Sequence, residues 1–103
     1  MPLPTDIEIF VKDKFVEHEQ LEALSVLENA KTHDGSMATP RLLRCALVAS
    51  DRTLKGLRYQ VAGLEMDYRD VVLAGEYTRN NGVSSHVWDL SKPFENSSPA
   101  RRE

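Results

Sequence analysis

The sequence predicts an all-α protein: a small bundle of three or four helices with a long amphipathic helix in its C-terminal part. The main observation is an apolar stripe at alternating steps of three and four, formed by Leu54, Leu57, Val61, Leu64, Tyr68 and Val71. Because an α-helix makes one turn in about 3.6 residues, this spacing places all six side chains on one face, whereas a strand would divide them between two. Two earlier segments carry helix-start signals, and only the stretch 83–90 alternates, weakly, with the period of a strand.

We expect one helical domain over residues 1–90 and a disordered tail over residues 91–103. The length of 103 residues fits a single domain, and a hydrophobic fraction of 41% supplies enough apolar side chains for a modest core. The last segment is rich in Ser, Pro, Asn and charged residues, so it cannot bury the apolar surface that would order it.

Cysteine usage and hydropathy predict a cytoplasmic protein. Cys45 is the single cysteine and lies in an apolar run, so we expect a small core residue in a reducing compartment. No apolar run approaches the roughly 18 residues of a membrane span, and the N-terminus lacks the basic and apolar segments of a secretory signal. We therefore expect no contact with a membrane.

The first helix is expected to begin at Thr5, because Thr5 and Glu8 have the spacing of a capping box. Apolar residues within 7–15 follow on one helical face. The polar stretch 16–20 is a place for a kink or a break before a further helical segment with three spaced leucines. Gly35 is suited to a left-handed position in the loop that follows.

A second buried helix is expected to start at Thr39, which can cap it, with Pro40 at the first helical position. Residues 42–48 are apolar almost all round, which is typical of an element buried on most sides. A strand is the alternative here, since a short apolar run has no diagnostic period. Ser50 or Asp51 then caps the long helix, so the connection is very short and the two helices must be neighbours.

The long helix is expected to span about 51–77 and to carry an interface. Gly56 and Gly63 lie seven residues apart near one line, which predicts the close approach of another helix; the alternative is that they have no packing role. Tyr59 and Met66 lie beside the apolar stripe and widen it, as expected for a helix that contacts both its own core and a second subunit. The predicted interface residues are Gly56, Tyr59, Gly63, Met66 and Trp88.

A turn is predicted at 80–82, where the sequence reads Asn-Asn-Gly. We expect the long helix to end near Tyr77, before this turn, and a short segment containing Trp88 to dock on the bundle. The alternative is a hairpin between 71–77 and 83–88.

Charge is distributed unevenly along the chain, whose net charge is −3. Residues 1–34 hold eight acidic and three basic side chains, whereas residues 41–58 hold one acidic and five basic ones. The simplest interpretation is two solvated faces of opposite sign that lie near each other in the fold or across a dimer. The alternative is a basic patch for an acidic partner, formed by Arg41, Arg44, Arg52, Lys55 and Arg58.

That patch straddles a helix, a short turn and a helix, so a helix-turn-helix that binds nucleic acid is the alternative function. The net acidity and the acidic second half of the long helix argue against it. Catalytic and cofactor motifs are missing: His18 and Glu22 lie one turn apart, but zinc needs three or four ligands. A pocket lined by Tyr59, Tyr68 and Tyr77 would instead indicate an enzyme or ligand carrier.

We therefore expect a non-enzymatic protein–protein interaction module, with self-association as one form of that function. No catalytic residue, cofactor or metal is predicted.

Overall fold

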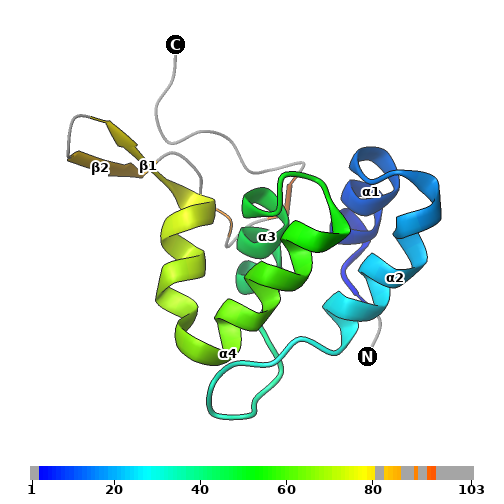
Figure 1. The fold of residues 1–103 in the computed structure, drawn as a ribbon, viewed down its shortest axis with the longest axis horizontal. Helices are drawn as coiled ribbons and strands as arrows, with labels where there is room; N and C mark the ends of the chain where they lie inside the picture. The colour runs from blue at the N-terminus through cyan, green and yellow to red at the C-terminus, as the bar shows by residue number, and fades with distance from the viewer. Residues whose placement is uncertain (1–2, 81–82, 87–89, 91–92, 95–103) are drawn as a thin grey trace.

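Four helices and one hairpin form the part of the chain that the structure, a computed structural model, describes: residues 3–80, 83–86, 90 and 93–94. The arrangement is all-α, as predicted, with the hairpin at the far end of the last helix (Figure 1). The elements in chain order are α1 (Thr5–Lys14), α2 (Glu17–Glu28), α3 (Pro40–Ala49), α4 (Leu54–Glu76), β1 (Tyr77–Asn80) and β2 (Val83–His86).

The helix α3 lies in the middle of the bundle and is the most deeply buried element (Figure 1). All six residues from 42 to 47 are buried, which confirms the predicted helix that is apolar on most sides. Thr39 caps it as predicted, since its Oγ1 accepts a hydrogen bond from the Leu42 amide at 3.4 Å, and Pro40 follows at the first position. The fully buried core side chains around it include Ile7, Val11, Leu27, Leu57, Leu64, Val71 and Leu90.

The start of α1 differs from the predicted capping box. Pro4 holds the cap position, and its carbonyl accepts hydrogen bonds from the amides of Ile7 and Glu8 at 3.1 and 3.2 Å. Thr5 already has helical backbone geometry, so its hydroxyl does not serve as a cap.

The predicted break between the first two helical segments is confirmed at Phe15 and Val16, which both have extended backbones. The side-chain amide of Gln20 donates to the carbonyls of Lys12 and Phe15 at 3.2 and 3.0 Å. It thereby satisfies acceptors at the end of α1 that have no partner within that helix. Gly35, in the following loop, has φ +85°, as predicted.

The connection from α3 to α4 sets the true start of the long helix. Asp51 and Arg52 have φ values of 58° and 61°, so two consecutive left-handed residues redirect the chain before a helix can begin. The cap is therefore Thr53 rather than Ser50 or Asp51, and its Oγ1 accepts from the Gly56 amide at 3.0 Å. A further first-turn amide, that of Leu54, donates to Glu19 of α2 at 3.0 Å.

The expectation of one straight helix is wrong at Asp67, which has φ −162° and ψ 101°. The chain turns back there, so the first half of α4 (54–66) and the second half (68–76) lie beside each other (Figure 1). The Asp67 carboxylate accepts from the Arg69 amide at 3.1 Å and caps the second half. The apolar stripe still faces inward at Leu57, Leu64 and Val71, whereas Tyr68, directly after the break, is 39% exposed.

The helix ends at Glu76, and an antiparallel hairpin follows in which Tyr77 pairs with His86 and Asn80 with Val83. The alternative hairpin is thus found over 77–80 and 83–86, whereas 71–76 are helical. The predicted docking of Trp88 and most of the predicted disordered tail lie outside the described residues. Leu90 is fully buried, and the Phe94 ring stacks on Phe10 with centroids 4.5 Å apart.

Candidate functional site

A surface groove of about 430 Å³ runs between the two halves of α4. It exists because the chain reverses at Asp67 and brings two short helical segments side by side. The first half contributes five residues and the second half three. They are Tyr59, Gln60, Ala62, Gly63, Met66, Asp70, Val71 and Ala74.

Small side chains form the middle of this groove. A Cβ atom at Gly63 would lie 3.1 Å from the Cγ2 of Val71, so a larger residue there would push the two halves apart. Ala62 and Ala74 line the same depression with single methyl groups. The predicted close approach of a helix at Gly63 is therefore made by the second half of α4.

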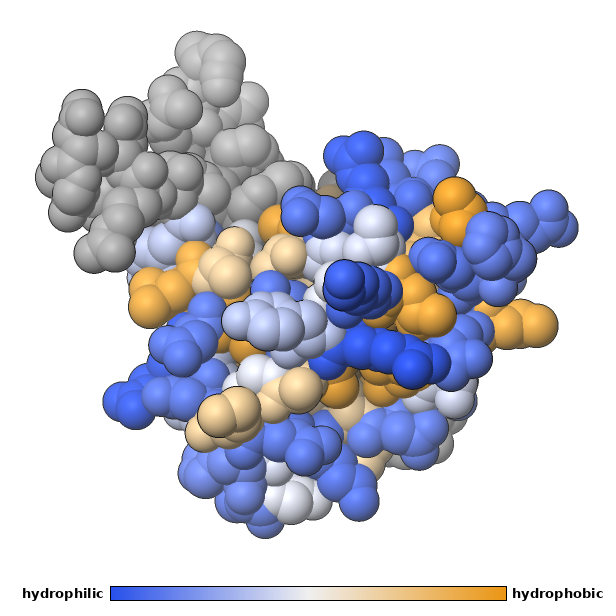
Figure 2. All heavy atoms as spheres, viewed as in Figure 1, coloured by the Kyte–Doolittle hydropathy of each residue, from blue (hydrophilic) through white to orange (hydrophobic). Residues whose placement is uncertain are grey.

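Large apolar side chains stand at the rim of the groove. Tyr59 is 76% exposed and Met66 is 83% exposed. On the face shown in Figure 2, near-neutral and apolar residues lie over α4, with strongly hydrophilic residues between them as well as along the edges. An apolar area rimmed by polar groups is typical of a protein interaction site.

Three of the five predicted interface residues, Tyr59, Gly63 and Met66, line this one groove. Gly56 does not. Its missing side chain leaves room for the carbonyl of Ser50, so this glycine serves the tight connection before α4. Trp88 lies outside the described residues.

The helices α3 and α4 also approach closely at Gly75, a contact that the sequence did not predict. A Cβ atom there would lie 2.6 Å from the Cα of Cys45. One signal in the sequence could have predicted this contact. Gly75 is a third glycine in the predicted helix, and it lies on the same face as the buried Val71.

The predicted basic patch is divided among separate ion pairs. Arg44 is 5% exposed and donates to Asp6 at 2.9 and 3.2 Å. Arg41 donates twice to Glu76, each time at 2.8 Å, and Arg58 pairs with Glu22. Arg52 and Lys55 are exposed at the start of α4.

These pairs agree in part with the simplest interpretation of the charge distribution, because opposite charges do lie near each other in the fold, although the Arg44–Asp6 pair is buried rather than solvated. Asp6 and Glu22 come from the acidic N-terminal third, and their partners come from the basic segment 41–58. The opposite charges therefore meet within one molecule, and three of the five predicted patch residues are neutralised there.

A buried polar cluster joins α3 to the end of α4. The carboxylate of Glu76 is fully buried and accepts from Arg41 and, at 3.3 Å, from the Leu90 amide. The Sγ of Cys45 lies 3.6 Å from the same carboxylate. Burial, followed by the charge of Glu76, raises the pKa of the Cys45 thiol to about 12, so it stays protonated at neutral pH and is a poor nucleophile.

A second buried pair holds residues 90 and 94 against the bundle. Arg44 donates to the Leu90 carbonyl at 3.1 Å, and the Phe94 amide donates to Asp6 at 3.0 Å. Burial alone would raise the pKa of Asp6, but the hydrogen bonds from Arg44 and Phe94 outweigh it and lower the pKa below its ordinary value.

Other sequence candidates do not converge on a site. In the described ranges no three His, Cys, Asp or Glu side chains are placed to hold a metal ion, and Glu22 pairs with Arg58 rather than with His18. Of the three tyrosines named above, only Tyr59 lines the groove. Among the same residues, no helix combines the length and apolarity required to cross a bilayer.

Comparison with protein-family models, with curated proteins and with solved structures gives no match to this chain.

Proposed function

We propose that this chain is a non-enzymatic protein–protein interaction module and that its binding surface is the groove between the two halves of α4. The observation that carries the proposal is the arrangement of Tyr59 and Met66, both more than three-quarters exposed, on either side of small groove residues. Aromatic residues and Met are enriched at interfaces because they bury a large area per side chain. Ala62 adds only a methyl group to the lining between them, so the groove keeps space for a side chain of a partner.

Surface Leu21 supplies a matched control, since it is 83% exposed on α2, as Met66 is on α4, but lies outside the groove. A photo-crosslinking amino acid is placed at Tyr59, Met66 or Leu21, and the protein is irradiated in its native cells. We expect positions 59 and 66 to form adducts with a defined protein. Position 21 should form no adduct with that protein. Adducts that are the same from all three positions, or from none, would contradict the proposed surface.

Nucleic-acid binding by α3 and α4 is the competing function. The observations in its favour are the four-residue connection at 50–53 and the exposed side chains of Arg52 and Lys55 at the start of α4. A gel-shift titration at low salt tests it, with the double variant Arg52→Glu and Lys55→Glu as the comparison. A salt-sensitive shift that the double variant abolishes would favour nucleic-acid binding.

A further inference from the structure

We infer that the cleft bounded by α1, α3 and the end of α4 is a peptide-binding site, which the chain's own Leu90 and Phe94 occupy in this structure. The ligand that fits it is a peptide with a leucine and, four positions later, an aromatic residue. The cleft is formed by other residues than the groove between the two halves of α4. The inference therefore goes beyond the proposed function and does not depend on it.

Side chains of the helices hold the backbone of the C-terminal segment. Glu76 accepts from the Leu90 amide at 3.3 Å, and Arg44 donates to the Leu90 carbonyl at 3.1 Å. Asp6 accepts from the Phe94 amide at 3.0 Å. All three hydrogen bonds are charge-assisted, which makes them stronger than neutral ones. Peptide-binding sites work in the same way, because main-chain hydrogen bonds supply affinity whatever the peptide sequence is.

Two side chains of the segment supply the selectivity. Leu90 is fully buried, so its position excludes charged and larger side chains. The ring of Phe94 stacks on that of Phe10, with centroids 4.5 Å apart and an angle of 22° between the planes. An aromatic ring gains from such a contact beyond the area that it buries. These two anchors define the spacing of leucine and aromatic residue in the ligand.

The charges of the cleft remain paired when the segment leaves. Arg44 donates to Asp6 at 2.9 and 3.2 Å, and Arg41 donates to Glu76 at 2.8 Å, all within the four helices. Departure of the segment breaks hydrogen bonds to backbone groups, which water can replace. It leaves no buried ion without a counter-charge, which is the change that would destabilise the helices strongly. The segment can therefore be exchanged for another peptide while the bundle stays folded.

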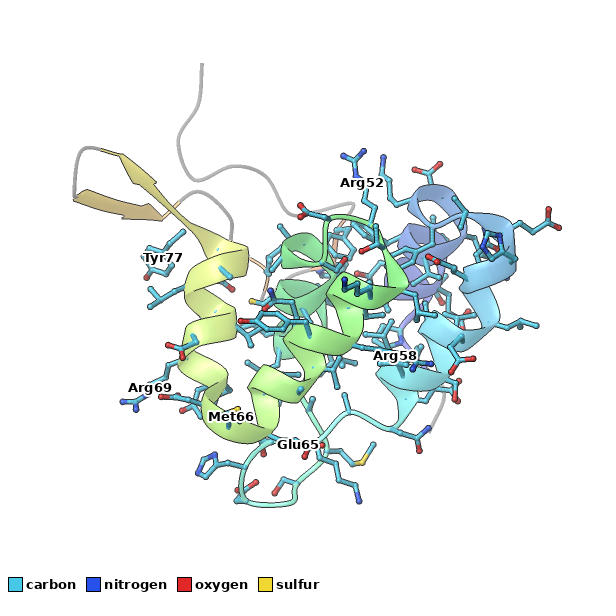
Figure 3. All side chains as sticks on the ribbon, in the orientation of Figure 1. Arg52, Arg58, Glu65, Met66, Arg69 and Tyr77 are labelled. Atoms are coloured by element: carbon cyan, nitrogen blue, oxygen red, sulfur yellow. The ribbon has the colours of Figure 1, made fainter. Side chains whose placement is uncertain are left out.

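The cleft is larger than its present occupant. Hollows of about 420 and 250 Å³ both border the Phe10–Phe94 ring pair. The larger one extends to Leu47 of α3 and to Arg52, which lies at its rim and points away from the bundle (Figure 3). Phe94 thus fills only part of the aromatic position. A peptide with the larger ring of tryptophan there would bury more apolar surface and bind more tightly.

Hydrogen exchange of the wild-type chain, followed by NMR, is the first test. The amides of Leu90 and Phe94 should exchange at least about tenfold faster, relative to their intrinsic rates, than those of Cys45 and Leu47 in α3. The reason is that the segment leaves the cleft while the helices stay folded. Equal protection of all four amides would mean that release requires unfolding of the bundle, and would overturn the inference.

Binding of a separate peptide is the second test. The double variant Leu90→Asp and Phe94→Asp replaces both anchors with carboxylates, and the one at position 94 meets the negative charge of Asp6. A fluorescein-labelled peptide of residues 88–96 should bind this variant at least about tenfold more tightly than wild type, in which the tethered segment competes. Fluorescence anisotropy measures the affinity, and circular dichroism confirms that the variant has folded. Leu21→Asp, which keeps both anchors, should bind the peptide as wild type does.

Peptide variants test the selectivity in the same assay. A peptide with Leu90→Asp should bind the double variant about tenfold more weakly or less, because its carboxylate would have to enter the leucine position. A peptide with Phe94→Trp should bind more tightly than the original. Weaker binding of the tryptophan peptide would contradict the aromatic position.

Two further outcomes would overturn the inference: a folded double variant that binds the peptide no more tightly than wild type, and equal binding of the original and Leu90→Asp peptides. Phe94→Asp alone changes a half-buried position and serves as a second variant that disturbs the core less. Crosslinking at positions 59 and 66 reports on the groove of α4, so a failure of the proposed function is distinguishable from a failure of this inference.

Discussion

Arg44 and Asp6 form a two-pronged ion pair whose side chains are 6% and 8% exposed, although 38 residues separate them in the chain. The pair joins α1 to α3 at the place where both also bond to the C-terminal segment, through Leu90 and Phe94. A single pair of charges thus ties three segments of the chain together.

Removing one member of this pair should destabilise the fold strongly. Asp6→Asn leaves the guanidinium of Arg44 buried without its counter-charge, so we expect the free energy of unfolding to fall by about 3 kcal/mol. Urea denaturation measures this change. Asp13→Asn is the control, because Asp13 is 65% exposed beside Lys14 and should change stability by less than about 1 kcal/mol. Equal losses in the two variants would contradict the buried role of Asp6.

Stability should depend on Asp6 ionisation at acid pH. The pKa of Asp6 is lower in the folded protein than its ordinary value of 3.8, because Arg44 and Phe94 hydrogen-bond to the ionised form against the effect of burial. Its contribution is therefore complete above pH 3.8 and is lost as the pH falls through the folded-state pKa. Urea denaturation of wild type and Asp6→Asn from pH 7 to pH 2.5 should show a stability difference that is constant at first and shrinks at the acid end. A constant difference down to the lowest pH would count against this explanation.

The thiol of Cys45 should be inert in the folded protein. Its burial and the charge of Glu76 raise its pKa to about 12, so almost no thiolate is present at pH 8. Ellman's reagent should modify Cys45 only as fast as the protein unfolds, and addition of urea should accelerate the reaction. A cysteine introduced at the exposed Leu21 should react at once in the same protein, which shows that the reagent is active.

Gly75 should tolerate no side chain. A methyl group there would meet the Cα and carbonyl oxygen of Cys45 at 2.6 and 2.7 Å, and backbone atoms cannot move aside easily. We expect Gly75→Ala to cost about 1–3 kcal/mol, measured by thermal or urea unfolding. Gly35→Ala, which meets no atom within 4 Å but has φ +85°, should cost about 1 kcal/mol from backbone strain alone. A neutral Gly75→Ala variant would mean that α3 and α4 are not in close contact.

Local signals predicted most helix positions correctly. The cap at Thr39, the glycine turn at Gly35 and the inward direction of Leu57, Leu64 and Val71 all depend on neighbouring residues and on the period of the helix. Part of the groove could be predicted for the same reason, because the spacing of Tyr59 and Met66 alone places them beside the apolar stripe.

The turn at Asp67 had no comparable signal, because neither Pro nor Gly stands there. A helical period continues through the position, and Val71 is buried after the chain has reversed. Thr5 and Glu8 show the opposite case, in which a valid capping pattern is not used because Pro4 already starts the helix.

By itself, the sequence determined which segments are helical and which side of each helix faces the core, because periodicity and caps act over a few residues. Only the tertiary structure decided that α4 folds back into a groove and that Arg41, Arg44 and Arg58 are neutralised by carboxylates. Those ion pairs join residues 35 to 38 positions apart. Contacts at such separations depend on how whole helices pack, so a local sequence pattern cannot predict them.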